Sequence, residues 1–323
     1  MHVNEIGFAL NIAVPVAVMA WDLESQWFRI FVACLIMHYA VAYTVYGMRS
    51  LFCVVVAPTY LTSAFLCLSM NYCALLYVIA VPMGIYKLAI PMSACFHRYS
   101  AHGAFKCGPV TRMCLGILGS TCIQGGPIWW ASQHRKHHKF CDTPRDPHSS
   151  KLVGTENAFA FFMNHPKVDE EFAPPYLEDY YMRILDTWSF VVFSLEVTLS
   201  YALLGREGIY LTYTSAYLCQ LITLWFNVCN HPPNQPAVCK AGNVRATPDS
   251  YYPAFWLCHF LYPLFGSIVQ EDLHEDHHDR ANLGKRCWWD MVYWGFLKPL
   301  ELAGLIWDIK CFDAKKAADT KTD

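Results

Sequence analysis

Histidine clusters are the feature of this sequence that most clearly indicates a chemical function. The chain has 14 His among 323 residues, and most of them fall in four short motifs. The motifs are His97-x4-His102, His134-x2-His137-His138, Asn227-x3-His231 and His274-x2-His277-His278. At this His frequency, one H-x-x-H-H pattern would arise by chance in roughly 0.03 of such sequences. Two copies in one chain therefore indicate a function.

The spacing of the motifs predicts where their side chains point. Residues i, i+3 and i+4 share one face of an α-helix, so each H-x2-H-H motif can aim its rings at one place. Asn227 and His231 are also four residues apart. The step from His97 to His102 differs, because five residues turn an ideal α-helix by about 140°. We therefore expect the helix to end between them, near Cys95.

Clustered neutral imidazoles are typical ligands of transition metals, and iron, copper and zinc all accept them. Nine His exceed the needs of one ion, which favours a two-metal centre. Neither triple contains the H-E-x-x-H pattern of zinc proteases. Iron with dioxygen is the leading assignment, because a His-rich ligand set leaves a strongly charged, oxidising centre able to remove hydrogen from an unactivated C–H bond.

The composition indicates the elements that carry these motifs. The chain is 55% hydrophobic and only 15% charged, which is too apolar for an ordinary soluble protein. We expect an all-α integral membrane protein, a multi-span helical bundle with a His-rich two-iron cap. Crossing a bilayer takes about 20 apolar residues, and candidate spans lie at 6–21, 27–46, 51–70, 73–95, 187–204 and 209–229.

Two further apolar stretches, 109–131 and 251–270, are long enough to cross. If either did, the histidine motifs would lie on opposite sides of the bilayer. We therefore expect both to be interfacial or buried helices.

The distribution of charge predicts the orientation. With the N-terminus in the cytosol, 21 of the 24 Lys and Arg lie inside, the exceptions being Arg29, Lys87 and Arg206, as the positive-inside rule requires. The metal site then faces the cytosol. No positive flank precedes the first apolar run, so we expect that run to be retained.

Two other observations exclude partners and cross-links. The formal net charge of −2 gives no basic excess for binding nucleic acid. The 15 Cys are scattered through apolar runs, so we expect them to be reduced core residues.

The four motifs, in this order, resemble the membrane fatty acid desaturases of the Δ9 acyl-lipid and acyl-CoA type. The resemblance extends to Gln124-Gly-Gly-Pro-Ile-Trp-Trp130, Lys139-Phe140, Asp146-Pro-His-Ser149 and Trp288-Trp289-Asp290. It divides the chain into an added N-terminal transmembrane hairpin (1–50), a desaturase domain (51–308) and a polar C-terminal tail (309–323). The third motif departs from the family: Gln270 replaces a Gly and Glu275 an Asn, while Glu271 stays in register.

The resemblance implies a site and a reaction. The nine motif His would bind two Fe²⁺ ions, Asn227 would hold a water ligand, and Gln124 and Trp130 would line the acyl path. With O₂ as co-substrate, the enzyme would insert a cis double bond at Δ9 of a saturated acyl-lipid or acyl-CoA. No H-P-G-G haem signature is present, so the electrons would come from a separate cytochrome b5 or ferredoxin, docking near Arg135, Lys136 and Lys139. The membrane would be the endoplasmic reticulum or an equivalent, such as a plastid or bacterial inner membrane.

Two other functions remain open on the sequence. One is a diiron hydroxylase acting on an alkane, sterol or sphingoid chain, and the extra carboxylate of Glu275 leaves this choice open. The other is a His-lined metal transporter. A transporter would place His and carboxylates inside the spans along a route, whereas these motifs lie at helix ends on one side.

Overall fold

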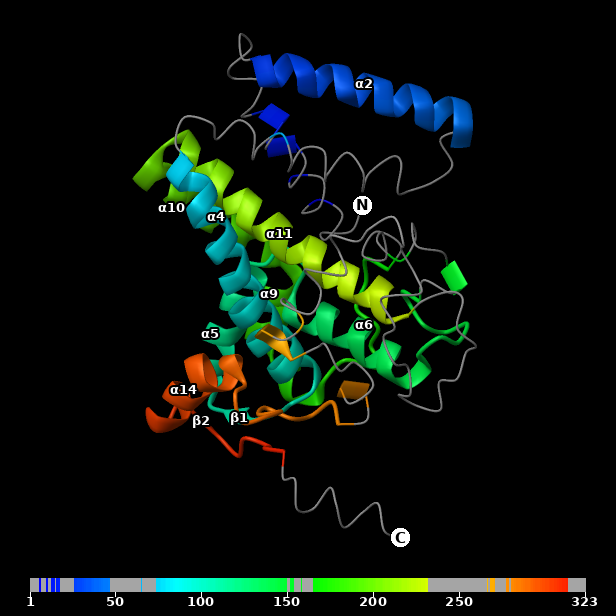
Figure 1. The fold of residues 1–323 in the computed structure, drawn as a ribbon. Coiled ribbons are helices and arrows are strands. Elements are labelled where there is room, and N and C mark those ends of the chain that lie inside the picture. The colour runs from blue at the N-terminus through cyan, green and yellow to red at the C-terminus, as the bar shows by residue number, and fades with distance from the viewer. Residues whose placement is uncertain are drawn as a thin grey trace.

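A computed structural model shows a mostly helical protein (Figure 1). The residues that it describes are 6, 10, 13–14, 16–17, 26–46, 65, 74–149, 152–153, 158, 165–231, 266, 268–270, 277–278 and 280–312. The helices are α2 (Gln26–Tyr46), α4 (Ala74–Lys87), α5 (Pro109–Ser120), α6 (Pro127–Phe140), α9 (Tyr180–Thr187), α10 (Ser189–Leu204), α11 (Arg206–Asn230) and α14 (Lys298–Leu302). The described residues also form two π-helices, η2 (Leu88–Ala101) and η5 (Tyr293–Leu297), and a 3-10 turn, η3 (Pro175–Leu177). They include two short strands, β1 (Lys106–Cys107) and β2 (Ile306–Trp307).

One helix among the described residues is long and apolar enough to cross a membrane. It is Val78–Ala101, in which α4 runs directly into η2. The pair α9 and α10, bent by 64° at Trp188, would make a second if counted as one span. The expected spans at 27–46 and 209–229 are helical, but α2 has only a shorter apolar stretch, Phe28–Val41, and α11 does not qualify. Those at 6–21 and 51–70 lie mostly outside the described residues.

The helix that carries the first histidine motif continues past its expected end. We expected it to stop near Cys95, and this is wrong, because η2 extends to Ala101. Its winding is π, with hydrogen bonds between residues five apart: the His102 N–H donates to the His97 carbonyl at 3.2 Å. Pro91 lies inside η2, and π winding accommodates a residue that cannot make the α-helical bond.

The stretch 109–131 is two helices rather than the single helix expected. Neither α5, with 12 residues, nor α6, with 14, is long enough to cross a bilayer, in agreement with the expectation that this stretch does not span. A six-residue break separates them, from Thr121 to Gly126. The stretch 251–270 is largely outside the described residues.

A residue distant in the sequence caps the N-terminus of α6. The Asp186 carboxylate, from α9, accepts hydrogen bonds from the backbone N–H groups of Ile128 (2.7 Å) and Trp129 (2.8 Å), which the first turn of a helix leaves without partners. A Cβ atom at Gly126 would lie 2.5 Å from the Asp186 carbonyl oxygen. Glycine is therefore required here, and α6 is fixed in place against α9.

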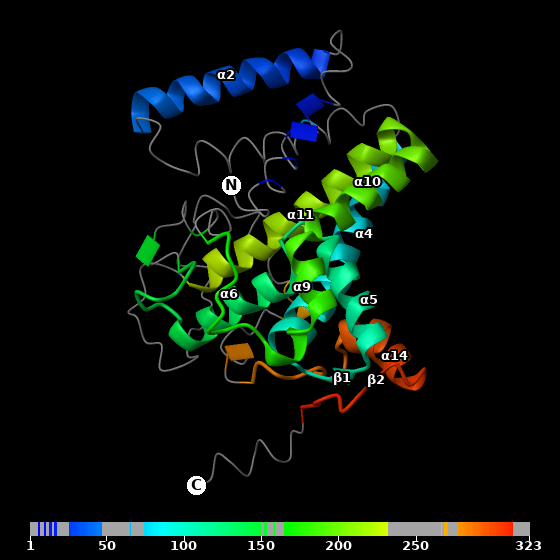
Figure 2. The ribbon, with the colours of Figure 1, turned by 180° about the vertical axis from the view of Figure 1, so that it is seen from behind.

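The helices α4, α10 and α11 pack together, and α2 lies across one end of them in both views (Figures 1 and 2). Their shared core contains Phe31 of α2, Phe193 of α10 and Tyr213 of α11. Lys87 ends α4 as a buried cation, but its Nζ lies 2.7 and 2.8 Å from the two carboxylate oxygens of Glu196. This ion pair explains how a charge is tolerated inside an apolar helix.

The C-terminal segment returns to the end of η2. Strand β2 pairs antiparallel with β1, matching Lys106 with Trp307. Arg98, fully buried in η2, forms an ion pair of 2.8 Å with Asp290, the last residue of the Trp288-Trp289-Asp290 motif. Asp290 also accepts the backbone N–H groups of Arg286 and Tyr293. This carboxylate therefore holds residues 286–293 against the first histidine motif.

Candidate metal centre

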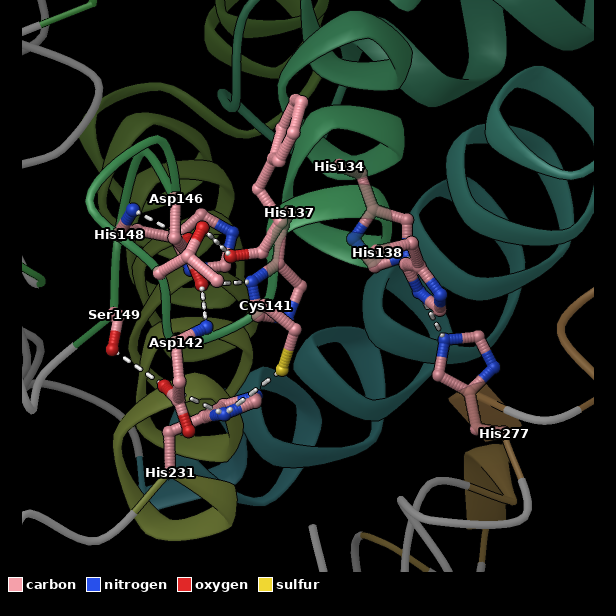
Figure 3. A network of polar contacts seen from close by, with 12 residues as sticks. His134, His137, His138, Cys141, Asp142, Asp146, His148, Ser149, His231 and His277 are labelled. Carbon is pink, nitrogen blue, oxygen red and sulfur yellow. Dashed lines mark hydrogen bonds and ion pairs between the residues drawn. The ribbon is translucent and has the colours of Figure 1, made fainter. Parts of the chain in front are cut away.

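Four segments bring histidine side chains together at one end of the helices: η2, α6, the end of α11 and residues 277–278. Figure 3 shows the histidines of α6 with His231 and His277. Among the residues with described side chains, eight of the ten predicted ligands meet there: His97, His102, His134, His137, His138, His231, His277 and His278. The π winding of η2 explains why His97 and His102 both take part. Residues five apart share a face of a π-helix, and their ring centroids are 4.8 Å apart.

The first histidine group consists of His97, His102, His134 and His277, whose nitrogens all lie within 4.8 Å of one another. The Nε2 atoms of His97 and His277 are 3.1 Å apart, and those of His102 and His134 are 3.0 Å apart. Donor atoms at right angles around an ion with bonds of about 2.1 Å would be separated by about 3.0 Å. The group therefore fits around a single ion.

The second histidine group consists of His137, His231 and His278, and Cys141 lies with them, again with donor atoms within 4.8 Å of one another. His138 lies between the two groups. Its Nε2 is 3.0 Å from that of His134 and 2.9 Å from that of His277, while its ring stacks on His278 at 4.1 Å.

Carboxylates orient the second group. Asp146 accepts a hydrogen bond of 2.9 Å from Nδ1 of His137 and also binds the backbone of Asp142 and His148. Asp142 approaches Nδ1 of His231 at 3.4 Å and is held by the Ser149 hydroxyl. With Nδ1 committed to a carboxylate, Nε2 of His137 is left to bind a metal.

A cation orients the first group. The Arg286 guanidinium lies 2.6 Å from Nδ1 of His277, and because arginine only donates, Nδ1 accepts. In the neutral ring Nε2 of His277 then carries the proton and faces His97 and His138, so a metal ion at Nε2 would have to displace that proton. The backbone of Arg286 is itself held by Asp290.

Burial keeps these rings neutral. It lowers the pKa well below the usual value of 6.5 for five of the rings that lie outside the apolar helix Val78–Ala101, and nearby Arg and His groups add to the effect: His102, His134, His138, His277 and His278. Burial likewise lowers the pKa of His148 to about 3. At Asp146 burial works to raise the pKa, but His137 outweighs it and holds the pKa below the usual range. At neutral pH the site therefore offers uncharged imidazoles beside an ionised carboxylate, which is the state that binds a metal.

Some predicted site residues cannot be placed in full. His274 lies outside the described residues, as does the side chain of Asn227, whose backbone is in the last turn of α11. Gln124 and Trp130, expected along the acyl path, are buried beside the first group: the Trp130 ring stacks on His134 at 4.8 Å.

Cys141, Asp142 and Arg286 belong to the site but were not expected from the sequence. Cys141 had a usable signal, because positions 134, 137, 138 and 141 follow the i, i+3, i+4, i+7 pattern of a single helix face. Asp142 had none, because its contact with His231 joins segments far apart in the sequence. Arg286 lies only nine residues after His277, but that separation matches no repeat of a helix face.

The fold and the site define a helical protein with buried histidine groups that can bind metal. No protein-family model matches the chain. It is 29% identical to the hex-5-enoyl-[acyl-carrier protein] acetylenase of Moorena producens, over 73% of this chain and 78% of that protein. It is also 29% identical to the sn-1 stearoyl-lipid 9-desaturase of Synechocystis sp. (73% and 70%) and 28% identical to the acyl-CoA C20 Δ5-desaturase of Anemone leveillei (67% of each). The chain is therefore a homologue of fatty acid desaturases, which are oxidoreductases.

Proposed function

We propose that the protein is an oxygen-dependent desaturase that inserts a cis double bond, at Δ9, into a saturated acyl chain carried as an acyl-lipid or acyl-CoA. Two iron ions would be held by the histidines of both groups together with His138, His274 and Asn227. The observation that carries this proposal is the convergence of neutral rings from four segments, with Nε2 atoms 2.9–3.1 Å apart across the first group and His138.

Iron held there would supply, with O₂ and two electrons, the oxidant that removes two hydrogens from adjacent methylenes. The reaction balances as one saturated chain, O₂, two electrons and two protons giving one unsaturated chain and two waters. The buried residues around the rings exclude water from this oxidant.

Gln124 and Trp130 support an acyl path beside the rings. Trp130 lies against His134 and, edge-on at 6.0 Å, against His97. Its indole N–H is 3.4 Å from the Gln124 carbonyl oxygen, and Gln124 donates to the Thr223 hydroxyl of α11 at 3.1 Å. A side chain held in this way forms a fixed wall. Because nothing chemical distinguishes one methylene from the next, such walls would set the position of the double bond.

The proposed topology is the six-span bundle with its metal site on the cytosolic side. It is supported by the apolar helix Val78–Ala101, which ends at the histidines. Cysteine labelling should reach positions 150, 240 and 318 from the same side as the N-terminus. Labelling of 150 and 318 from opposite sides would contradict this topology. The division into segments 1–50, 51–308 and 309–323 also remains a prediction.

The proposed donor, cytochrome b5 or ferredoxin, would dock near Arg135, Lys136 and Lys139. Lys136 already pairs with Asp169 at 2.8 Å, whereas Lys139 is exposed above the rings of Phe140 and Phe172. We therefore centre the docking face on Lys139. Its replacement by Glu should slow electron transfer most at low salt.

Desaturation is favoured over hydroxylation because three relatives that match over about two thirds or more of their length are named desaturases or an acetylenase. The test is expression of the chain in a desaturase-deficient host, followed by gas chromatography–mass spectrometry of acyl derivatives. A new cis-Δ9 monoene is expected. A hydroxylated product would contradict the proposed reaction, and a monoene at another position would contradict Δ9 alone.

A further inference from the structure

Cys141 directly follows α6 and lies inside the second histidine group, and its surroundings are those of a metal-binding side chain. It is 3% exposed. Its Sγ lies 3.8 Å from Nδ1 of His231, and its sulfur is within 4.8 Å of donor atoms of His137, His231 and His278. Figure 3 shows the sulfur between the rings of His137 and His231.

The position of Cys141 follows from the helix that carries it. It is four residues after His137 and three after His138, so it extends the row of His134, His137 and His138 along one face of α6. An ion that His137 holds on that face therefore lies within reach of Sγ.

We infer that the Cys141 thiolate is a ligand of the metal ion in the second histidine group, beside His137, His231 and His278. This inference rests on the metal centre of the proposed function. Around a tetrahedral ion with bonds of about 2.3 Å to sulfur and 2.0–2.1 Å to nitrogen, sulfur and nitrogen would be about 3.6 Å apart. In the structure, one donor atom from each of Cys141, His137, His231 and His278 lies within 4.8 Å of the others, so modest side-chain movement would bring them to this spacing around an ion.

Binding would replace the S–H proton by the metal, and the proton would leave to solvent without any change of oxidation state. The second ion would then have one soft, anionic donor, whereas the first group offers only imidazole nitrogens among the described residues. The two ions of the centre would differ in affinity and in preferred metal.

The nearby carboxylates bind the histidine rings and so do not take the role of metal ligand from the Cys141 sulfur. Asp146 and Asp142 take the Nδ1 positions of His137 and His231, so the rings need no thiol to hold them in place. Cys141 as a hydrogen-bond partner of His231 is the competing role, and the experiment separates the two.

The experiment loads the purified full chain with Zn²⁺ and measures metal content and X-ray absorption at the zinc edge. The wild type should show sulfur at about 2.3 Å from zinc in addition to nitrogen at 2.0–2.1 Å. Cys141→Ser should lose the sulfur signal and bind its second ion more weakly. Cys122→Ser, an equally buried cysteine outside the described histidine groups, is the matched control and should keep both.

Zinc surrounded only by nitrogen and oxygen in the wild type would overturn the inference, and so would a sulfur signal that survives Cys141→Ser. Neither result requires activity, so each can be told apart from failure of the proposed function. If the protein forms monoenes but its zinc has only nitrogen and oxygen neighbours, the inference about Cys141 fails and the desaturase proposal stands. If the sulfur signal is present but no product forms, the desaturase proposal fails and the inference about Cys141 stands.

Discussion

The first and second histidine groups share α6, which carries His134 of the first and His137 of the second, but residues of opposite charge orient them. In the first group, Nδ1 of His277 faces the guanidinium of Arg286 at 2.6 Å. In the second, Nδ1 of His137 donates to the carboxylate of Asp146 at 2.9 Å. A carboxylate partner raises the basicity of a metal-binding imidazole, whereas a cation draws electron density from it. Two ions bound here would therefore be inequivalent, with the electron-richer ion in the second group.

The largest effect should come from removing one ring of either group. We expect His134→Ala to remove the ion of the first group and His278→Ala that of the second, each leaving about one ion per chain and no detectable product. Metal analysis and product analysis on the same preparation measure both. His165→Ala, a histidine away from both groups, should keep metal and product. If either ring variant retained full metal content and full turnover, its group would not be a metal site.

The second prediction tests how the first group is held. Asp290→Asn leaves the buried Arg98 without its charged partner, and breaking a fully buried pair costs about 3–5 kcal/mol. We expect a large drop in the midpoint of thermal unfolding in detergent. Asp308→Asn breaks the exposed pair with Lys106 and should change stability by no more than about 0.5 kcal/mol. Equal effects of the two variants would contradict the assigned role of the Asp290 pair.

The third prediction separates the groups by affinity. Asp146→Asn removes the carboxylate that orients His137, and loss of such a partner typically weakens metal binding by about 10–100-fold. In a titration with two binding steps, only one should weaken. Asp169→Asn, which breaks the contact with Lys136 away from the rings, should leave both steps unchanged. Equal weakening of both steps would show that the groups are not independent.

The smallest effect concerns pH in the metal-free protein. Burial lowers the pKa of His148 to about 3 from an ordinary value of 6.5. Below pH 6.5 the His148 ring therefore binds a proton in the unfolded chain but stays neutral in the folded chain. Stability should therefore fall as the pH drops from 6.5 toward 3, and stay level above 7. His148→Asn should recover about 1 kcal/mol of this loss at pH 5.5. A midpoint that rises on acidification would contradict the neutral, buried state of this ring.

The spacing of residues along the sequence predicted which histidines meet at the site, but not the ion pair and helix cap that hold their segments in place. The H-x2-H-H pattern predicted that His134, His137 and His138 would share a face of α6, because residues three and four apart always do. The same reasoning misplaced the end of the helix at Cys95, because π winding cannot be anticipated from α-helical geometry. The Arg98–Asp290 pair and the cap from Asp186 had no local signal. They join residues 192 and 58 positions apart, and only the folded chain brings these together.

The π winding of η2 also determines the residue spacing that the first histidine motif needs. His97 and His102 point the same way only while the helix is wound with bonds between residues five apart. If η2 returned to α winding with the motif unchanged, the five-residue step would turn His102 about 140° away from His97, and the two rings would no longer share a site. The five-residue spacing of the first motif and the π winding of η2 therefore depend on each other.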